Sequence, residues 1–335
     1  MKRIVFRADA SAAIGSGHIM RCLGLAEIFA KAGFDVTFAA SAESFGLVGA
    51  LKDSALDRCV LQVAPDDEPA ALRRHWPDGV DLVLVDHYGR DIAFDRACRG
   101  WARKVIVVDD LADRVHDADV LLDGVNHPDD YRGLVPADCA LLCGPRYALI
   151  DSRFPAARDR AIARRDRRPV ERVLVTFGQI DAPNMTMRAL AALRGVGFDG
   201  DVDIAIGAAA PHLAEVRGAA TGRVRLHVNA TNLPALKIAA DLAIGAGGVT
   251  AWERCCLGLP SVITVIAGNQ KTQVAIILNR GAGIGAGEPG EGAEERIASA
   301  AGRLIADADL RARMARSAAE LIDGHGPMRL VQAAV

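Results

Sequence analysis

A short glycine loop carries the first side chain that could act in acid–base chemistry. The loop Gly15-Ser16-Gly17 ends at His18, and it follows a short β-branched run at 2–7 that is typical of a β-strand. Glycines allow the backbone to turn tightly and to approach a ligand. A neutral imidazole at the carboxyl edge of a sheet can take a proton from water. His18 is therefore a candidate general base, and a histidine that only caps the following helix is the alternative.

A polar cluster follows the apolar run at 82–85. It reads Asp86-His87-Tyr88-Gly89. In an open α/β sheet, residues at the carboxyl ends of strands face the ligand crevice. Asp86 could therefore orient His18 or hydrogen-bond a substrate. A simple turn closed by Asp86 and Gly89 is the other interpretation.

Two adjacent acids, Asp109 and Asp110, follow the next buried run at 105–108. Neighbouring carboxylates repel unless one of them is hydrogen-bonded or protonated. This pair could line a pocket at the same edge of the sheet, or it could simply begin the next loop.

A second candidate loop spans 178–184 and follows a strand predicted at 172–177. It contains Gly178, Asp181 and Asn184. Free backbone N–H groups before a helix accept an anion, so these residues are candidate contacts to a phosphate or a sugar. An ordinary turn between a strand and a helix is the alternative.

The strongest motif spans 245–253 and places three glycines between a predicted strand and a predicted helix. Because Gly247 and Gly248 have no side chains, their backbone amides could hold a diphosphate with help from the helix dipole. Thr250 could cap the helix and contact a phosphate. Glu253 lies one turn further on, where its carboxylate could bind both hydroxyls of a ribose. A flexible turn followed by an acid in the first helical turn is the simpler alternative.

Two further pairs of polar residues have side chains of the kinds that bind sugars or metal ions. Asn269 and Gln270 end the next loop between a strand and a helix and are candidate sugar contacts. Asp201 and Asp203 have the Asp-x-Asp spacing of some metal-dependent sugar transferases. They begin a strand rather than end one, so we interpret them as a surface turn and expect no metal site. Backbone amides, a helix terminus and an arginine would then meet the charge of a leaving diphosphate.

The elements that position these residues alternate between strands and helices. The runs at 82–85 and 105–108 are continuously apolar, which is typical of strands covered on both faces of a parallel sheet. The predicted strands are 2–7, 35–39, 61–63, 82–85, 105–108, 120–122, 141–143, 172–177, 202–206, 224–227, 242–244 and 261–265. The predicted helices are 19–32, 185–193, 251–257 and 272–279, with a largely helical end from 293 to 335.

This pattern predicts an α/β fold with two Rossmann-like domains facing a cleft. The chain has 335 residues, and domains of roughly 100–200 residues make two the natural number. We expect the first domain, with the catalytic histidine, at 1–155 and the second, with the nucleotide loop, at 168–335. A cleft between domains is the default ligand site.

Composition excludes several classes of function. Forty Lys and Arg against 42 Asp and Glu give a formal net charge of −2, so no nucleic-acid partner is expected. The basic run at 158–172 is interrupted by Asp159, Asp166 and Glu171, and we interpret it as a solvated linker. No apolar run reaches the ~20 residues of a membrane span, and the beginning lacks a signal peptide. Seven cysteines without a pairing framework favour reduced thiols and a cytoplasmic location.

Several motifs together resemble one enzyme family, the bacterial UDP-2,4-diacetamido-2,4,6-trideoxy-β-L-altropyranose hydrolases of pseudaminic acid biosynthesis. The order of the motifs matches as well, and the resemblance spans nearly the whole chain. The matching segments are Ile14-Gly15-Ser16-Gly17-His18, Asp86-His87-Tyr88-Gly89, Gly144-Pro145-Arg146-Tyr147-Ala148-Leu149, the stretch 245–253, and Asp323-Gly324-His325-Gly326.

The resemblance implies a fold of the glycosyltransferase-B type, similar to the MurG peptidoglycan transferases. It implies hydrolysis of the bond between the anomeric carbon and the UDP oxygen, with inversion and without a metal or other cofactor. His18 would deprotonate water, Gly247-Gly248 would hold the diphosphate and Glu253 the ribose. The residues implied at the sugar are Asp86, Tyr88 and Asn269.

Two residues depart from the family pattern. Gln179 stands where the family usually has a second glycine, and this side chain could reshape the sugar pocket. Val249 stands where the family commonly has a hydroxyl residue, so one phosphate contact is lost or shifts to Thr250. These departures affect the predicted sugar more than the predicted reaction.

Two other functions fit the same architecture. A glycosyltransferase would differ only in the attacking group, because fold does not decide chemistry. A non-catalytic UDP-sugar-binding protein would keep the glycine loop and Glu253 but would not need His18.

Overall fold

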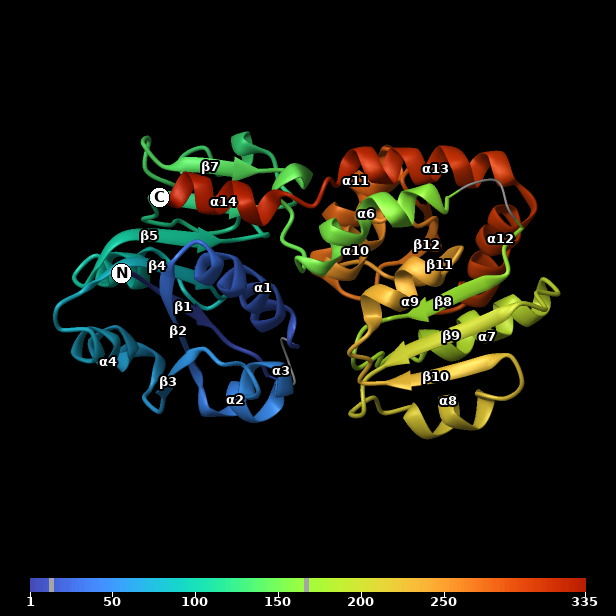
Figure 1. The fold of residues 1–335 in the computed structure, drawn as a ribbon, viewed down its shortest axis with the longest axis horizontal. Coiled ribbons are helices and arrows are strands. Elements are labelled where there is room, and N and C mark those ends of the chain that lie inside the picture. Colours follow the sequence, from blue (N-terminus) through green and yellow to red (C-terminus); the bar gives the residue numbers. More distant parts are fainter. Residues whose placement is uncertain (12–14, 166–168) are drawn as a thin grey trace. The chain divides into compact units, whose positions relative to one another are not determined.

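The computed structural model describes residues 1–11, 15–165 and 169–335, so Ile14 and Asp166 lie outside the described residues (Figure 1). The chain forms two compact units, each built on its own parallel sheet. The first unit comprises Met1–Ser152 and His325–Val335, and the second comprises Arg153–Gly324. The predicted fold class, an α/β protein with two Rossmann-like domains, is confirmed.

The first unit contains a seven-stranded sheet with the order β3-β2-β1-β4-β5-β6-β7 among the described residues. Its strands are β1 (Lys2–Ala8), β2 (Phe34–Ser41), β3 (Asp57–Leu61), β4 (Val80–Asp86), β5 (Ala102–Val108), β6 (Val120–Asp123) and β7 (Ala140–Cys143). Its helices are α1 (Gly17–Lys31), α2 (Ala42–Leu47), α3 (Gly49–Lys52), α4 (Glu68–His75), α5 (Ile92–Cys98) and α14 (Gly326–Ala334), with short 3₁₀ turns η1 (Pro65–Asp67), η2 (Pro128–Tyr131) and η3 (Pro145–Tyr147).

Helices cover both faces of this sheet. Ile4 and Phe6 of β1 pack into a core shared with α1 and α14. Val5, between them, points to the opposite face, where α4 and α5 contribute Leu72 and Phe94. Successive side chains of a strand point to opposite faces, so a strand buried on both sides must be apolar throughout. This is the reason that the uninterrupted apolar runs predicted the parallel sheet correctly.

The second unit contains a six-stranded sheet with the order β10-β9-β8-β11-β12-β13. Its strands are β8 (Arg172–Thr176), β9 (Asp201–Ile206), β10 (Val224–Val228), β11 (Leu242–Ala246), β12 (Ser261–Thr264) and β13 (Ile284–Gly285). Its helices are α6 (Arg153–Ala163), α7 (Met185–Gly195), α8 (Leu213–Ala219), α9 (Leu233–Ala239), α10 (Val249–Cys256), α11 (Lys271–Asn279), α12 (Ala293–Ala306) and α13 (Ala308–Leu321), with the 3₁₀ turn η4 (Gly268–Gln270).

The division of the chain differs from the expected boundaries of 1–155 and 168–335, because the last helix belongs to the first unit. Leu330 and Val331 of α14 join the core beneath α1. A Cβ added to Gly326 would lie only 2.4 Å from the carbonyl oxygen of Ala148, so only a glycine allows α14 to approach η3 this closely. Two segments of the family resemblance, 144–149 and 323–326, therefore meet in the fold.

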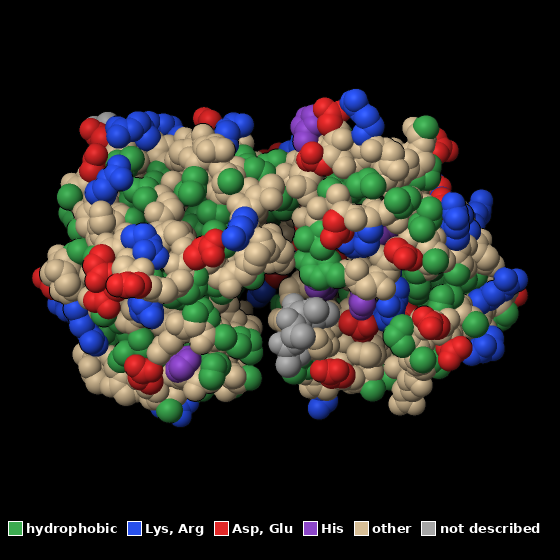
Figure 2. All heavy atoms as spheres, turned by 180° about the vertical axis from the view of Figure 1, so that it is seen from behind, with side chains coloured by type: hydrophobic (Ala, Val, Ile, Leu, Met, Phe, Trp, Pro, Cys, Tyr) green, Lys and Arg blue, Asp and Glu red, His purple; other side chains and the backbone are tan. Residues whose placement is uncertain are grey.

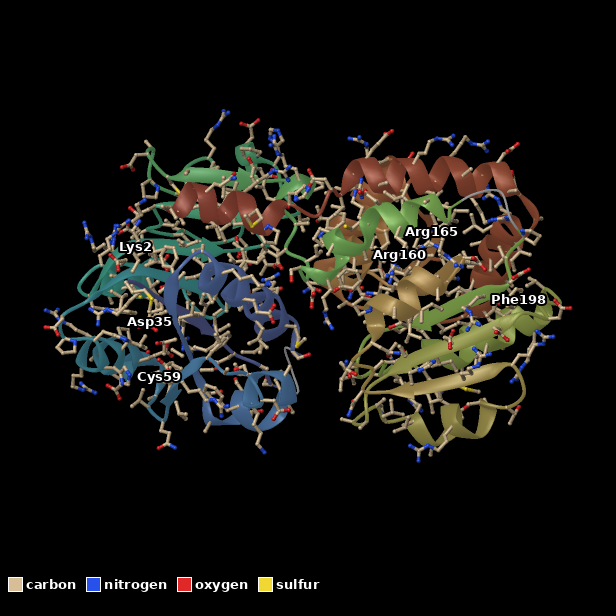
Figure 3. The ribbon with its side chains drawn as sticks, in the orientation of Figure 1. Lys2, Asp35, Cys59, Arg160, Arg165 and Phe198 are labelled. Carbon is tan, nitrogen blue, oxygen red and sulfur yellow. The ribbon has the colours of Figure 1, made fainter. Side chains whose placement is uncertain are left out.

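The interpretation of the basic run as a solvated linker is wrong for the described residues 158–165, because most of this stretch is helix α6. Arg158 donates hydrogen bonds to the carbonyl oxygens of Cys256, Ala319 and Ile322, at 2.6, 2.6 and 2.8 Å. Arg165, just after α6 (Figure 3), donates to the carbonyl oxygens of Lys237, Ala240 and Leu257. These carbonyls lie at or near the ends of α9, α10 and α13, where helices leave backbone acceptors unpaired.

The distribution of charged side chains, the helices and the cysteines can each be compared with what the composition predicted. On the face seen in Figure 2, Lys and Arg side chains are interspersed with Asp and Glu side chains. None of the helices in the described stretches combines the length and apolar character that crossing a membrane requires. All seven cysteines are free thiols.

We expect Arg158→Met to destabilise the second unit by about 2–4 kcal/mol, because three backbone carbonyls lose a charged donor. Native-state hydrogen exchange of α10 and α13 in the full chain measures this loss directly. Arg160→Met is the matched control, since Arg160 lies exposed on the same helix (Figure 3). Equal protection of the two helices in both variants would contradict the structural role of Arg158.

Candidate active site

The topology of the first sheet brings His18 and Asp86 together. β1 and β4 are neighbours, and Ala8 pairs with Asp86 at their carboxyl ends. The loop after β1 leads into α1, so His18 lies in the first turn of that helix. The His18 Nδ1 atom lies 2.5 Å from Oδ1 of Asp86, and the Asp86 side chain is completely buried. Of the two roles considered for Asp86, the geometry fits the orientation of His18.

The contact to Asp86 selects one tautomer of the imidazole. A carboxylate accepts a hydrogen bond, so Nδ1 of His18 carries the proton and Nε2 carries the lone pair when the ring is neutral. The ring of Tyr88 packs against it edge-on, with 4.4 Å between centroids and an interplanar angle of 87°. His18 is thus held in one orientation by a charged partner on one side and an aromatic ring on another.

The two glycines before this imidazole differ in what the backbone requires of them. Gly15 has a φ of +72°, a conformation that L side chains rarely adopt. A Cβ added to Gly15 or to Gly17 would meet no described atom within 4 Å. Glycine is therefore required at position 15 by the backbone conformation, whereas the described atoms near position 17 impose no steric requirement for it.

Arg21 is a member of this cluster that the motif search missed. Its Nε and Nη2 atoms donate to Oδ2 and Oδ1 of Asp86, each at 2.6 Å, and its Nη1 atom donates to Asp110 at 2.9 Å. Burial by itself would raise the pKa of Asp86, but the charge of Arg21 and the contact with His18 hold it well below its usual range. Arg21 lies three residues after His18 on α1, and this i,i+3 spacing could have revealed it.

The adjacent acids Asp109 and Asp110 have different surroundings. Asp110 pairs with Arg21, whereas the buried Asp109 accepts hydrogen bonds from the Ala112 amide at 3.0 Å and the Tyr131 hydroxyl at 2.9 Å. The same hydroxyl lies 2.6 Å from Asp123, and burial raises the pKa of that carboxyl. Asp110 thus belongs to the histidine cluster, and Asp109 stabilises the loop that follows β5.

In the second unit, the two central glycine amides are already occupied. The Gly247 amide donates to the carbonyl oxygen of Thr264 at 3.3 Å, and the Gly248 amide donates to the side chain of Gln273 at 2.5 Å. Gln273 also donates to the Gly248 carbonyl oxygen at 2.9 Å. A Cβ on Gly247 would lie 2.8 Å from Val274. These glycines therefore serve close packing, which differs from the prediction that their amides hold a diphosphate.

The open donors of this loop are one residue further along. α10 begins at Val249, and Gly248 caps it with a φ of +79° and without a side-chain hydrogen bond. Across the residues that the structure describes, the backbone N–H groups of Val249 and Thr250 form no hydrogen bond. Both residues are partly exposed. The first turn of α10 can therefore accept an anion at its amides.

A buried lysine lies behind this helix end. Lys237 of α9 has no exposed surface, and its Nζ atom donates to the Thr250 hydroxyl at 2.8 Å and contacts the Glu253 carboxylate. It also lies 5.0 Å from the centre of the Phe154 ring. Thr250 was expected to cap α10, but its hydroxyl binds Lys237 instead. The signal that was missed is a single charge within the apolar stretch 233–239.

The loop at 178–184 is a helix cap and not an anion site. The buried carboxylate of Asp181 accepts hydrogen bonds from the amides of Met185 and Thr186, at 2.9 and 2.8 Å. It therefore occupies the N-terminus of α7 that was predicted to bind an anion. Asn184 donates to Glu215 at 2.7 Å, and Gly178 supplies a φ of +91° at the end of β8. The ordinary turn, considered as an alternative, describes this loop.

The remaining predicted polar residues have structural partners. Gln270 accepts a hydrogen bond from the Ile266 amide at 3.0 Å, and Asn269 lies beside it in η4. The interpretation of Asp201 and Asp203 as a surface turn is wrong, because both lie in β9 and the Asp203 side chain is buried. Both carboxylates pair with Arg172, at 2.6 and 2.8 Å. The described residues contain no group of three or more metal-ligating side chains.

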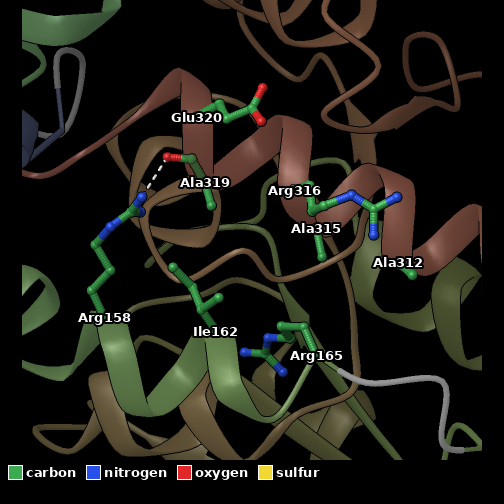
Figure 4. A pocket seen from close by; sticks show the side chains of 8 residues that line it. All are labelled: Arg158, Ile162, Arg165, Ala312, Ala315, Arg316, Ala319 and Glu320. Carbon is green, nitrogen blue, oxygen red and sulfur yellow. Dashed lines mark hydrogen bonds between the residues drawn. The ribbon is translucent and has the colours of Figure 1, made fainter.

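A cavity of about 310 Å³ lies between α6 and α13, and its lining includes Arg158 and Arg165, the two arginines that bind helix ends (Figure 4). Arginines in a cavity suggest an anion site at first sight. Arg158 and Arg165, however, donate to backbone carbonyl oxygens, as the dashed line to Ala319 illustrates for Arg158. These two guanidinium groups are therefore engaged in structural contacts, and the exposed Arg316 is the third arginine of the lining.

Comparison with curated proteins confirms the resemblance drawn from the motifs, although no family model matches the chain. The chain is 27% identical over 240 residues to the UDP-2,4-diacetamido-2,4,6-trideoxy-β-L-altropyranose hydrolase of Campylobacter jejuni, covering 70% of this chain and 81% of that protein. It is 24% identical over 329 residues to the spore coat polysaccharide biosynthesis protein SpsG of Bacillus subtilis, covering 96% and 95% of the two chains.

Comparison with solved structures gives the fold. MurG of Acinetobacter baumannii superposes with a TM-score of 0.68 at 15% identity, and the match covers 99% of each chain. The spinosyn rhamnosyltransferase SpnG superposes with a TM-score of 0.61 at 17% identity. The chain thus has the fold of the glycosyltransferase-B enzymes, as the resemblance implied.

We expect Asp181→Ala to lower the free energy of unfolding of the second unit by about 1–2 kcal/mol, the usual cost of losing a helix cap. Faster hydrogen exchange at the beginning of α7 is the specific readout. Asp199→Ala removes an exposed acid of the same unit and serves as the control. If Asp181→Ala left exchange in α7 unchanged, the carboxylate would not be the cap.

Proposed function

We propose that this chain hydrolyses a UDP-linked 2,4-diacetamido-2,4,6-trideoxyhexose, releasing UDP and the free sugar for a nonulosonate of the pseudaminic acid type. The observation that carries the proposal is the His18 imidazole, fixed through Nδ1 by the buried Asp86 with Nε2 left as the base. The similarity to the Campylobacter hydrolase supports the substrate class.

The reaction needs one proton acceptor and one leaving group. Nε2 of His18 takes a proton from water as the water oxygen bonds to the anomeric carbon. The bond from that carbon to the UDP oxygen breaks, and UDP leaves with the electron pair, so the sugar inverts its configuration. The imidazolium that forms is stabilised by Asp86, whose charge is retained throughout, and it returns its proton to solvent.

The second unit supplies groups suited to the nucleotide. The open amides of Val249 and Thr250 would bind the diphosphate at the N-terminus of α10. Because these donors belong to the backbone, the loss of a hydroxyl side chain at position 249 does not remove them. The buried Lys237 binds both the Thr250 hydroxyl and the Glu253 carboxylate, so it fixes these two side chains of α10 beside the open amides. Glu253, whose Oε2 atom is held by Lys237, would bind the ribose hydroxyls through its other oxygen.

A sugar transferase is the second candidate, because the solved structures that match share this fold. In that reaction an acceptor hydroxyl would replace water, and the same histidine could deprotonate it. The two functions therefore differ only in whether UDP is released without an acceptor.

We expect the purified chain to release UDP and a free sugar from its UDP-sugar without any acceptor, as followed by NMR in water. His18→Asn should lower turnover by at least ~10²-fold, the scale of a general base, while UDP binding persists. His75→Asn, an exposed histidine on α4, is the matched control. Release that depends on an added acceptor would favour the transferase, and full activity of His18→Asn would remove the proposed base.

We also expect Glu253→Ala to weaken UDP binding by about 10- to 100-fold, because a charged acceptor of ribose hydroxyls is lost. Calorimetric titration with UDP measures this effect without turnover. Glu320→Ala on α13 removes an exposed glutamate of the same unit and should bind UDP normally. An unchanged affinity of Glu253→Ala would argue against the ribose contact.

A further inference from the structure

We infer that Arg21 is a positioning residue that keeps His18 in its neutral, basic form by neutralising Asp86. The role of His18 as the base rests on the proposed function, but the effect of Arg21 on its protonation does not. Asp86 alone would orient the imidazole and would also favour its protonation. Arg21 separates these two effects.

The contacts show how one guanidinium can do this. Arg21 binds both carboxylate oxygens of Asp86 at 2.6 Å, which is the planar, bidentate geometry that an arginine fork favours. Its Nη2 atom also lies 3.2 Å from Nδ1 of His18. The guanidinium therefore lies within hydrogen-bonding distance of the imidazole, on the same side of the ring as the Asp86 carboxylate.

Charge then determines which form of His18 is favoured. A carboxylate in contact with an imidazole stabilises the imidazolium, whereas a nearby cation destabilises it. The side chains of Arg21 and Asp86 are largely buried, with 12% and 0% exposed, so salt screens their charges weakly. The guanidinium stays protonated at any physiological pH. The pair Asp86–Arg21 by itself therefore presents a hydrogen-bond acceptor to His18 with little net charge, and the remaining negative charge of the cluster is that of Asp110, which contacts the Nη1 atom of Arg21.

The other groups around His18 do not replace Arg21. From α1, Cys22 points its thiol at Asp86 at 3.4 Å, and burial raises the pKa of this thiol, so it stays neutral. From the loop after β4, the Tyr88 ring contacts His18 edge-on. From the loop after β5, Asp110 reaches the cluster through Arg21. Arg21 is thus the cation that these contacts bring to the imidazole.

The test is an NMR titration of the His18 imidazole in the full chain without substrate. Arg21→Met should move the midpoint of His18 protonation to higher pH by about one unit or more, since Asp86 is then uncompensated. Asp86→Asn should move it to lower pH, because Arg21 then remains without its main partner. Opposite shifts from two neighbouring substitutions would not arise from loosened packing. Arg99→Met, which removes the partner of Asp117 and Asp119, is the control and should leave the midpoint in place.

The dependence of kcat/KM on pH gives the second readout. In Arg21→Met the acidic limb of the profile should move to higher pH by the same amount. Arg21→Lys should show a smaller shift than Arg21→Met, because lysine keeps the positive charge but cannot form the bidentate contact. A midpoint that moves by less than about 0.3 unit in Arg21→Met, or that moves to lower pH, overturns the inference. If the midpoint moves as expected but the wild type releases no UDP, the inference about Arg21 stands and the proposed hydrolysis falls.

Discussion

The first unit depends on one buried carboxylate that satisfies three donors at the end of a central strand. Asp86 accepts contacts from His18, Arg21 and Cys22, all of which lie on the first turns of α1. An ionised carboxylate without partners would be too costly to bury. The same contacts that make Asp86 tolerable in the core therefore fix the rotation of α1 against β4, and with it the orientation of the imidazole. Stability and site geometry here have a common cause.

Three helix N-termini that follow strands show how a single side chain changes what such an end can do. At α1 the first turn carries His18, whose ring is turned toward Asp86. At α7 the carboxylate of Asp181 occupies the amides of Met185 and Thr186, so these two donors are not open to a ligand. At α10 the cap is Gly248, which has no side chain, and the amides after it stay open. The backbone at the three N-caps differs as well, since Ser16, Asn184 and Gly248 have φ values of −101°, +52° and +79°. The side chains near each end and the local backbone together therefore decide which amides stay open to an anion.

Sequence alone was sufficient for most strands and for part of the site, but it did not predict β13 (Ile284–Gly285), and the difference has a physical origin. The strands at 82–85 and 105–108 were predictable because burial on both faces leaves a local pattern. His18 and Asp86 were found because local patterns mark them: a glycine loop precedes His18, and Asp86 ends the apolar run of β4. Gln273 and Lys237 were not found, since each acts on a loop 13 to 25 residues away in sequence. Such partners depend on how α9 and α11 pack, which no local spacing encodes. α6 was missed for a related reason, because its arginines bind helix ends that are distant in sequence.

The fold permits both hydrolysis and transfer, so the choice of nucleophile must come from what can approach Nε2 of His18. An oriented base is indifferent to whether the hydroxyl that it deprotonates belongs to water or to an acceptor. A site that selects water must offer no favourable binding contacts to a larger acceptor. Such contacts depend on the residues around His18 and not on the imidazole itself. Asp86 contacts both His18 and Arg21, so the orientation of the imidazole is set within the first unit and needs no contact from an acceptor.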